Sequence, residues 1–283
     1  MVRQRRRLRL SRTGARRLRQ IGLLLASLLV LVPFLFPFVW MVMGSLKTEV
    51  AYTAYPPVWA FTPTLENYRR VLTNGNFGWY MLNSAIIAGA ATTLALVFGI
   101  PAAYTIARYR WRGLGFLLLA MRAAPLIAFL IPLFVLYVKL HLVNTYTGLI
   151  AAHILITLPI VVWMMVGFIE ALPRELEEAA RLDGASVAAV LWRIVVPLTA
   201  PGIAAASILS FIFSWNNFLV SVVLSGEHTQ PLTVAIFNFL GYETIEWGPL
   251  SAAASIVTIP VLCLALVVQR YIVRGLLTGG LAG

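Results

Sequence analysis

The stretch Pro173–Pro201, PRELEEAARLDGASVAAVLWRIVVPLTAP, decides how the rest of the chain is interpreted, because it interrupts sequence that is otherwise apolar. Six charged residues crowd its first part, between Arg174 and Asp183. Charged side chains at this density are too costly to place in the hydrocarbon core of a bilayer. The stretch is therefore predicted to lie in water or against another protein.

The same residues predict two short helices joined by a tight turn. Pro173 suits the first position of a helix, and Gly184 suits the left-handed residue just past its end. Ser186 is predicted to cap a second helix over Val187–Val196, which Pro197 then stops.

Length and charge favour a docking surface over a plain connector. Glu177 and Arg181 stand four residues apart in the favourable order, so we expect them to pair on the first helix, worth about 0.2–0.5 kcal/mol. A short antiparallel connection needs far fewer residues than this stretch contains.

The flanking sequence is that of a membrane protein, with 60% hydrophobic and 11% charged residues among 283. A helix needs about 20 apolar residues to cross a bilayer. Six runs meet that length approximately, so we predict an all-α, polytopic fold with six transmembrane helices. The predicted spans are 21–43, 82–107, 114–138, 149–169, 202–224 and 250–268.

These spans divide the chain into five parts. A basic tail (1–20) precedes the first transmembrane helix (21–43), and an ordered extramembrane loop follows (44–80). The five-helix transmembrane core covers 81–272 and includes 173–201, and a short tail (273–283) ends the chain. Thr64 is predicted to cap a short helix in the loop.

The distribution of Lys and Arg predicts the orientation. The first tail, the loop at 108–112, the stretch 173–201 and the C-terminal segment hold nine, three, three and two positive residues, against four on the opposite face. Positive residues concentrate on the cytoplasmic side. Both termini and the charged stretch, which lies between the fourth and fifth spans, are therefore predicted to face the cytoplasm.

The first tail holds nine of the 22 positive residues, so the formal charge of +12 indicates orientation and contact with anionic lipid rather than nucleic-acid binding.

Several classes of activity lack their chemistry in this sequence. The only lysines are Lys47 and Lys139, and neither follows a glycine, so there is no phosphate-binding loop. The histidines His141, His153 and His228 are dispersed, and no metal-ligand spacing is found. His153 is most simply a packed polar residue. The chain is thus not expected to be an enzyme, and any ATP would be hydrolysed by another chain.

Ion-coupled transport also lacks an obvious carrier, because no acidic residue falls inside a predicted span. Arg122, within the third span, either lines a solute path or extends its head to the inner interface.

Two motifs in the charged region carry a family resemblance: EAARLDGA at Glu178–Ala185 and PLTAPGI at 197–203. They resemble the EAA loop of permease subunits in bacterial ABC importers. Further matching segments are SLKT at 45–48, ENYRRVL at 66–72, NS at 83–84, AAYTIARYRWRG at 102–113, IPLF at 131–134, SWNNF at 214–218 and QRYIVRGLLTGG at 269–280. Together they are similar to the second permease of the carbohydrate-uptake subfamily, the maltose-transporter type.

The resemblance implies a multi-pass protein of the bacterial inner membrane. It would form a heterodimer with a homologous permease and work with two cytoplasmic ATPase subunits and an external solute-binding protein. ATP and Mg would be bound by the ATPases, and no cofactor by this chain. By resemblance, the residues that couple to the ATPase are Glu178, Ala179, Ala180, Asp183 and Gly184.

The predicted solute path centres on Trp215, Asn216 and Asn217, which lie midway along the fifth predicted span. An aromatic face and two amides can bind sugar rings and hydroxyls, although asparagines also hydrogen-bond neighbouring helices. The expected cargo is a sugar or sugar derivative. Alternatives are a polyol or a glycerophosphodiester in the same architecture, or, in a different class, an intramembrane enzyme or a membrane scaffold.

Overall fold

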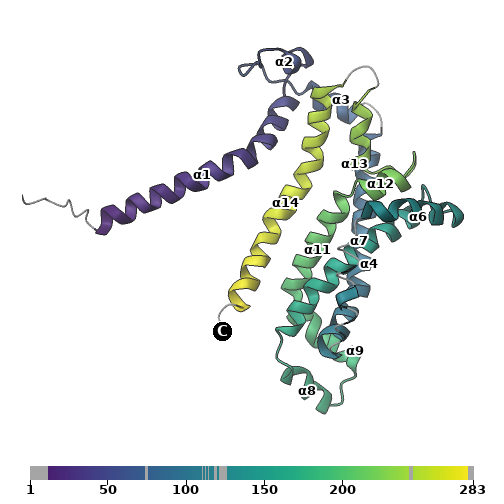
Figure 1. The fold of residues 1–283 in the computed structure, drawn as a ribbon. Helices are drawn as coiled ribbons and strands as arrows, with labels where there is room; N and C mark the ends of the chain where they lie inside the picture. Colours follow the sequence, from purple (N-terminus) through teal and green to yellow (C-terminus); the bar gives the residue numbers. More distant parts are fainter. Residues whose placement is uncertain are drawn as a thin grey trace, which may run out of the picture.

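The computed structural model describes residues 12–73, 76–241 and 245–279, with smaller gaps at 110, 112, 114, 118–119 and 121–125. Its described elements are helical, apart from one isolated bridge between Leu240 and Ile245. The all-α prediction is therefore confirmed for the described residues. Figure 1 shows an elongated bundle with α2 and α3 at one end and α8 at the other, referred to below as the α3 end and the α8 end.

Four helices are long and apolar enough to cross a membrane: α1 (Arg12–Ser45), α4 (Phe77–Tyr109), α7 (Tyr146–Glu170) and α14 (Trp247–Gly279). A fifth candidate is a bent pair, Val187–Leu198 and Ala200–Trp215, whose halves meet at 79°. Part of the predicted third span, including Arg122, lies outside the described residues. The described part of that span includes the shorter apolar helix α6 (Leu126–Lys139). Six spans stay a prediction.

The short elements lie between and around these helices. At the α3 end are α2 (Glu49–Thr53), α3 (Glu66–Thr73), α13 (Leu232–Ala235) and the 3₁₀ turn η2 (Ile236–Phe239). The charged stretch forms α8 (Glu175–Leu182), α9 (Val187–Val190), the π-helical turn η1 (Leu191–Val195) and α10 (Val196–Leu198). The fifth span continues as α11 (Ala200–Trp215) and α12 (Leu219–Leu224).

The core forms where α4, α7 and α11 pack together. A row of small buried residues on α4, including Ala91, Ala95 and Gly99, lets the helices approach closely. A Cβ at Gly99 would come within 2.7 Å of Val161 Cγ1 on α7. Gly202 on α11 lies directly against the ring of Phe168 on α7, with no room for a Cβ. These helices therefore form one closely packed unit.

Two helices lie largely outside this unit. The side chains described from residue 19 to residue 39 on α1 are all exposed, and α1 diverges from the bundle below its contact with α14 (Figure 1). On another side, α6 protrudes and is held mainly through Leu130 and Tyr137, which pack against α12. Large apolar faces of this chain are thus left without a protein neighbour.

The α3 end is held by side chains that bond to backbone atoms. Both Glu49 carboxylate oxygens accept hydrogen bonds at the start of α14, from the N–H groups of Trp247 and Gly248 at 3.1 Å each. The buried Asn67 amide donates to the carbonyls of Ser45 and Lys47 at 2.9 and 2.7 Å. These contacts join α2 to α14 and α3 to the end of α1. The Thr64 hydroxyl accepts from Glu66 N–H at the start of α3, as predicted.

Candidate functional site

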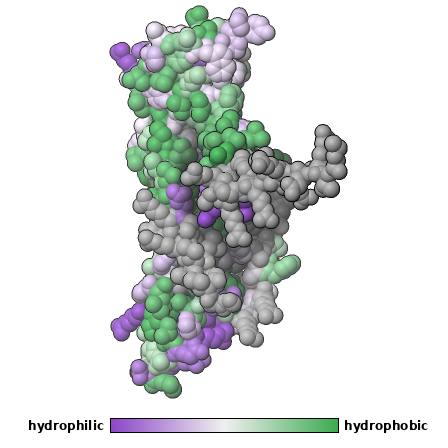
Figure 2. Space-filling model, turned by 90° about the vertical axis from the view of Figure 1, so that its left-hand side faces the viewer, coloured by the Kyte–Doolittle hydropathy of each residue, from purple (hydrophilic) through white to green (hydrophobic). Residues whose placement is uncertain are grey.

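The charged stretch lies at the α8 end, where Figure 2 shows hydrophilic side chains gathered below a largely apolar surface. Three carboxylates, Glu175, Glu177 and Glu178, occupy the first turn of α8, where they complement the helix dipole. Gly184 follows the helix with φ +86°, and the Ser186 hydroxyl accepts from Ala189 N–H at 3.2 Å to cap α9. The helix, turn and helix predicted from these residues are confirmed.

Two details of that prediction are wrong. Pro173 is not the first helical residue: α8 begins at Glu175, and Pro173 lies in the bend that connects it to α7. The second helix does not stop at Pro197, because the π-helical turn η1 precedes it and the proline falls at the start of α10. A missing N–H is tolerated at that position. The chain bends instead at Thr199.

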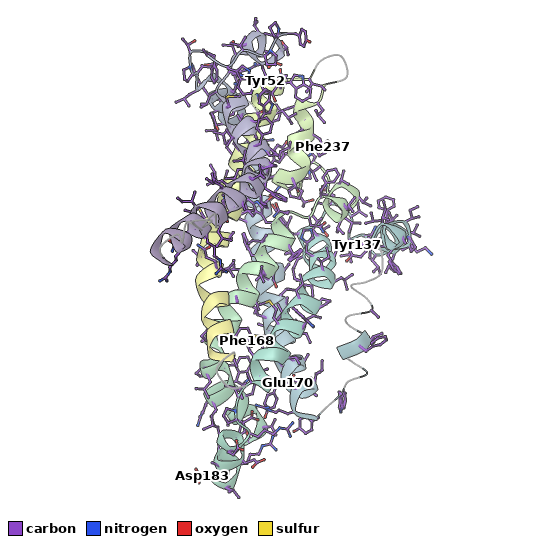
Figure 3. All side chains as sticks on the ribbon, turned by 60° about the vertical axis from the view of Figure 1, so that its left-hand side comes forward. Tyr52, Tyr137, Phe168, Glu170, Asp183 and Phe237 are labelled. Carbon is purple, nitrogen blue, oxygen red and sulfur yellow. The ribbon has the colours of Figure 1, made fainter. Side chains whose placement is uncertain are left out.

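The outward face of α8 carries most of the predicted coupling residues. Glu178, Ala179, Asp183 and Gly184 are exposed, whereas Ala180 is half-buried against the core around α4 and α7. Leu182, on the same helix, is 90% exposed. Figure 3 places Asp183 at the extreme end of the molecule, beyond Phe168 and Glu170.

The inward side of α8 is organised around Glu177. One carboxylate oxygen, Oε1, accepts from Arg108 Nε at 2.7 Å and lies 2.6 Å from Arg108 Nη2, while Oε2 accepts from the Tyr104 hydroxyl at 2.8 Å. The Arg108 and Glu177 side chains are only 8% and 7% exposed. Arg108 also donates to the carbonyl of Leu172, between α7 and α8, at 3.2 Å. We refer to Tyr104, Arg108 and Glu177 as the Glu177 cluster.

The predicted ion pair between Glu177 and Arg181 is therefore wrong. Glu177 turns toward α4 and pairs with Arg108, and Arg181 lies against Tyr104, with Nη2 3.4 Å from its hydroxyl. Hydrogen bonds to Tyr104 and Tyr109 raise the pKa of Arg181, so its guanidinium stays charged. A small pocket of about 110 Å³ lies among Arg108, Tyr109, Arg174, Glu177, Glu178 and Arg181.

Sequence reasoning missed the Glu177 cluster. Arg108 was assigned to a basic loop, but it lies in the last turn of α4, 69 residues from its partner. The sequence signal that points to this cluster is a pair of consecutive acidic residues, Glu177 and Glu178. On a helix, adjacent residues face about 100° apart, so two consecutive glutamates cover a wide arc of the helix and one of them can face the bundle.

The predicted solute-path residues do not lie within a continuous span. The helix α11 ends at Trp215, and α12 starts at Leu219, so Trp215, Asn216 and Asn217 occupy a break. Trp215 is buried, and its Nε1 donates to the Val257 carbonyl on α14 at 3.2 Å. Asn217 Oδ1 accepts from Val220 N–H at the start of α12. These two side chains stabilise the break, and Asn216 is exposed.

A buried histidine bridges the same break. His153 on α7 lies 2.7 Å from the Ser214 hydroxyl through Nδ1 and 3.2 Å from the Ser221 hydroxyl through Nε2. It is 1% exposed, which confirms that His153 is a packed polar residue. Because Ser214 lies on α11 and Ser221 on α12, one imidazole ring contacts the helices on both sides of the break. Among the described residues, no group of three or more potential metal ligands is found.

Residues 95–278 match the family model described as "Binding-protein-dependent transport system inner membrane component". The chain belongs to this family. Its membership confirms the class predicted from the EAA loop: the membrane permease of an ABC importer, which is a transport component and not an enzyme. The match includes α7 to α11 and therefore the whole charged stretch.

Individual relatives agree over nearly the full length. The chain is 36% identical to the sulfoquinovosyl glycerol transport system permease protein SmoH of Agrobacterium fabrum, covering 92% of this chain and 93% of SmoH. It is 35% identical to the trehalose/maltose transport system permease protein MalG of Thermococcus litoralis, covering 94% and 98%. A crystal structure of a bacterial ABC transporter involved in alginate import matches with a TM-score of 0.74 at 25% identity, covering 93% of this chain and 98% of that one.

Proposed function

We propose that this permease carries a sugar or a sugar derivative. The observation that supports this cargo is that relatives aligned over nearly their whole length are named for carbohydrate transport, from trehalose and maltose to sulfoquinovosyl glycerol. A polyol or a glycerophosphodiester is the alternative cargo in the same architecture.

A transport assay with a panel of solutes tests this proposal. The transporter would be reconstituted in proteoliposomes with the subunits encoded beside this chain, and uptake of radiolabelled disaccharides, sugar glycosides, polyols and glycerophosphodiesters would be compared. We expect ATP-dependent uptake of a saccharide or glycoside. Uptake of a polyol or glycerophosphodiester with none of any sugar would contradict the proposal.

The proposed assembly contains a second, homologous permease, two ATPase subunits that bind ATP and Mg, and an extracytoplasmic solute-binding protein. The exposed apolar faces of α1 and α6 support a neighbouring permease surrounded by lipid. Co-purification through a tag on this chain tests the composition: we expect both permeases and two ATPases per complex. Recovery of this chain with no second permease would contradict the heterodimer.

The proposed topology has six spans with both termini in the cytoplasm of a bacterial cell and the 44–80 loop outside. The bent fifth span and the short α6 supply the two crossings beyond the four long helices. Single cysteines introduced at Tyr55, which is 96% exposed, and at Asp183, in a Cys263→Ser background, would be labelled in intact cells with a membrane-impermeant reagent. We expect Tyr55→Cys to react and Asp183→Cys to stay protected.

Coupling to the ATPase is proposed for the outward face of α8, which carries Glu178, Ala179, Asp183 and Gly184, with Ala180 supporting the helix from within. The exposure of this face at the α8 end supports a docked partner. Glu178→Lys should weaken ATPase association and abolish uptake, measured by co-purification and transport. Normal association and uptake in that variant would contradict the assignment.

Solute contact is proposed for the break in the fifth span, and Asn216 is its best candidate. Its side chain is exposed and bonds only locally, to the Ile212 carbonyl at 3.1 Å. Asn216→Ala should raise the solute concentration for half-maximal uptake without loss of protein. Asn217→Ala should instead lower the amount of folded protein, because it removes the cap of α12.

A further inference from the structure

The coupling helix α8 is attached to the bundle by two kinds of link. Its ends are covalently continuous with α7 and, through α9 and α10, with α11. Its link to α4 depends on side chains: half-buried Ala180 packs against the core, and Glu177 reaches the last turns of α4. Removing the carboxylate would therefore weaken the link between α8 and α4, while the packing of Ala180, the contact of Arg181 with Tyr104 and both covalent connections stay in place.

Both oxygens of the Glu177 carboxylate accept hydrogen bonds from donors on the same helix. Arg108 and Tyr104 both belong to α4, and together they contact both carboxylate oxygens. Arg108 additionally holds the Leu172 carbonyl, so α4 is bonded to the connection between α7 and α8 as well as to α8 itself. Because the pair is nearly excluded from water, solvent does not compete for these contacts as it does at a surface ion pair.

The opposite side of α8 is free. Leu176 and Leu182 are exposed, and so are Glu178 and Asp183. A force applied to that face by a partner would reach α4 through the Glu177 cluster. Along the rest of its length α4 is closely packed against α7 and α11, so its displacement would be carried into the core of the bundle.

We propose that Glu177, Arg108 and Tyr104 are positioning residues that make α4 move together with the coupling helix. Motion enters the permease through this polar connection as well as through the covalent connections to α7 and α11. The inference rests on the proposed coupling role of α8. It concerns residues other than the exposed ones to which that role was assigned.

Glu177→Gln in the complete reconstituted transporter tests the proposal. The amide keeps the size of the side chain and removes its charge. We expect solute transported per ATP hydrolysed to fall by about fivefold or more, the range of a typical coupling energy, with the complex still assembled. Glu175→Gln is the matched control, because it makes the same change on the exposed part of the same turn, and it should leave that ratio unchanged.

A structural role alone would give a different result. If Glu177→Gln lowered transport and ATP hydrolysis in proportion, through less folded protein, the proposal would be wrong. The exchange Arg108→Glu with Glu177→Arg is the second variant: each single reversal should abolish coupling, and the double exchange should restore part of it. No recovery in a stably assembled double variant would also overturn the proposal.

A distance measurement separates this proposal from the function on which it rests. Spin labels at Phe98→Cys on α4 and Glu175→Cys on α8, in a Cys263→Ser background, report the separation of the two helices by pulsed EPR. We expect the same distance with and without ATP when Glu177 is intact, and a nucleotide-dependent change in Glu177→Gln. A distance that nucleotide leaves unchanged both with intact Glu177 and in Glu177→Gln would overturn only the proposed role of the Glu177 cluster. Failure of the wild-type chain to associate with any ATPase would overturn the proposed coupling function of α8 as well.

Discussion

The two ends of this permease hold their helices together in different ways. At the α3 end, Glu49 bonds to backbone atoms of α14, and Asn67 bonds to backbone atoms at the end of α1 and just after it. At the α8 end, the contact between α4 and α8 is made by ionised side chains. The bonds to backbone atoms tie main-chain segments of the α3 end to one another, whereas the side-chain bonds of the α8 end link α4 to α8 as a pair. The α3 end is therefore suited to holding its segments in place, and the α8 end to moving α4 and α8 together.

The two ion pairs sharpen the contrast. Arg70 and Glu246 lie 3.2 Å apart at the α3 end with side chains 43% and 45% exposed, where water and salt weaken their attraction. Arg108 and Glu177 lie 2.6 Å apart and are almost fully buried. Loss of one partner leaves a charge without water or a counter-charge only at the α8 end.

The largest effect is expected from Gly184→Pro at the turn of the α8 end. Proline holds φ near −65°, whereas this turn requires +86°. The turn cannot form, so α8 would be misplaced, and uptake in proteoliposomes should be lost although the spans still insert. Gly184→Ala is the milder control, since a Cβ there meets no neighbouring atom and only the left-handed backbone is disfavoured. Normal uptake by a stably inserted Gly184→Pro protein would contradict the importance of this end.

Arg108→Leu comes next. It leaves the Glu177 carboxylate buried without its cation, which typically costs about 3–5 kcal/mol. We expect a clear drop in the unfolding temperature of the purified protein in detergent, measured by differential scanning fluorimetry. A companion change of Glu177 to Leu should recover much of the loss, because it removes the unpaired charge. Equal stability of Arg108→Leu and wild type would show that the pair is solvated.

Asn67→Ala should have an intermediate effect at the α3 end. It removes two hydrogen bonds and leaves the carbonyls of Ser45 and Lys47 unsatisfied in a buried position. The expected loss is about 1–3 kcal/mol per unsatisfied group, seen in the same thermal assay. Coupling between transport and ATP hydrolysis should not change, and a change would break the distinction drawn between the two ends.

The smallest effect is expected for Arg70→Ala. Exposed ion pairs contribute about 0–1 kcal/mol to stability. The unfolding temperature of the Arg70→Ala protein should therefore stay close to that of wild type, and the difference should depend little on added salt. A loss as large as that of Arg108→Leu would show that exposure does not separate the two pairs.

The sequence predicted those features that depend on neighbouring residues. Apolar length predicted the long helices, and Gly184 and Ser186 predicted the turn and the second cap at the α8 end.

It did not predict features that depend on distant residues. The orientation of Glu177 is decided by a guanidinium from another helix, and a local i,i+4 pattern favoured Arg181 instead. The break after Trp215 was missed because the two asparagines that interrupt the apolar run were assigned to the solute path and not to the end of a helix. It is stabilised by contacts to Val257 on α14 and His153 on α7, which no local pattern reveals.

The bend at Thr199 has a geometric consequence for the fifth span. Val187–Leu198 forms an arm set at 79° to α11; at 1.5 Å per residue it is about 18 Å long. Because the arm lies nearly perpendicular to α11, a sideways shift at its α8 end becomes rotation of α11 about its own axis. A shift of about 3 Å over that length corresponds to a turn of about 10°. Such a rotation would change which side chains near Asn216 face outward from the bundle, without moving α11 along its own axis.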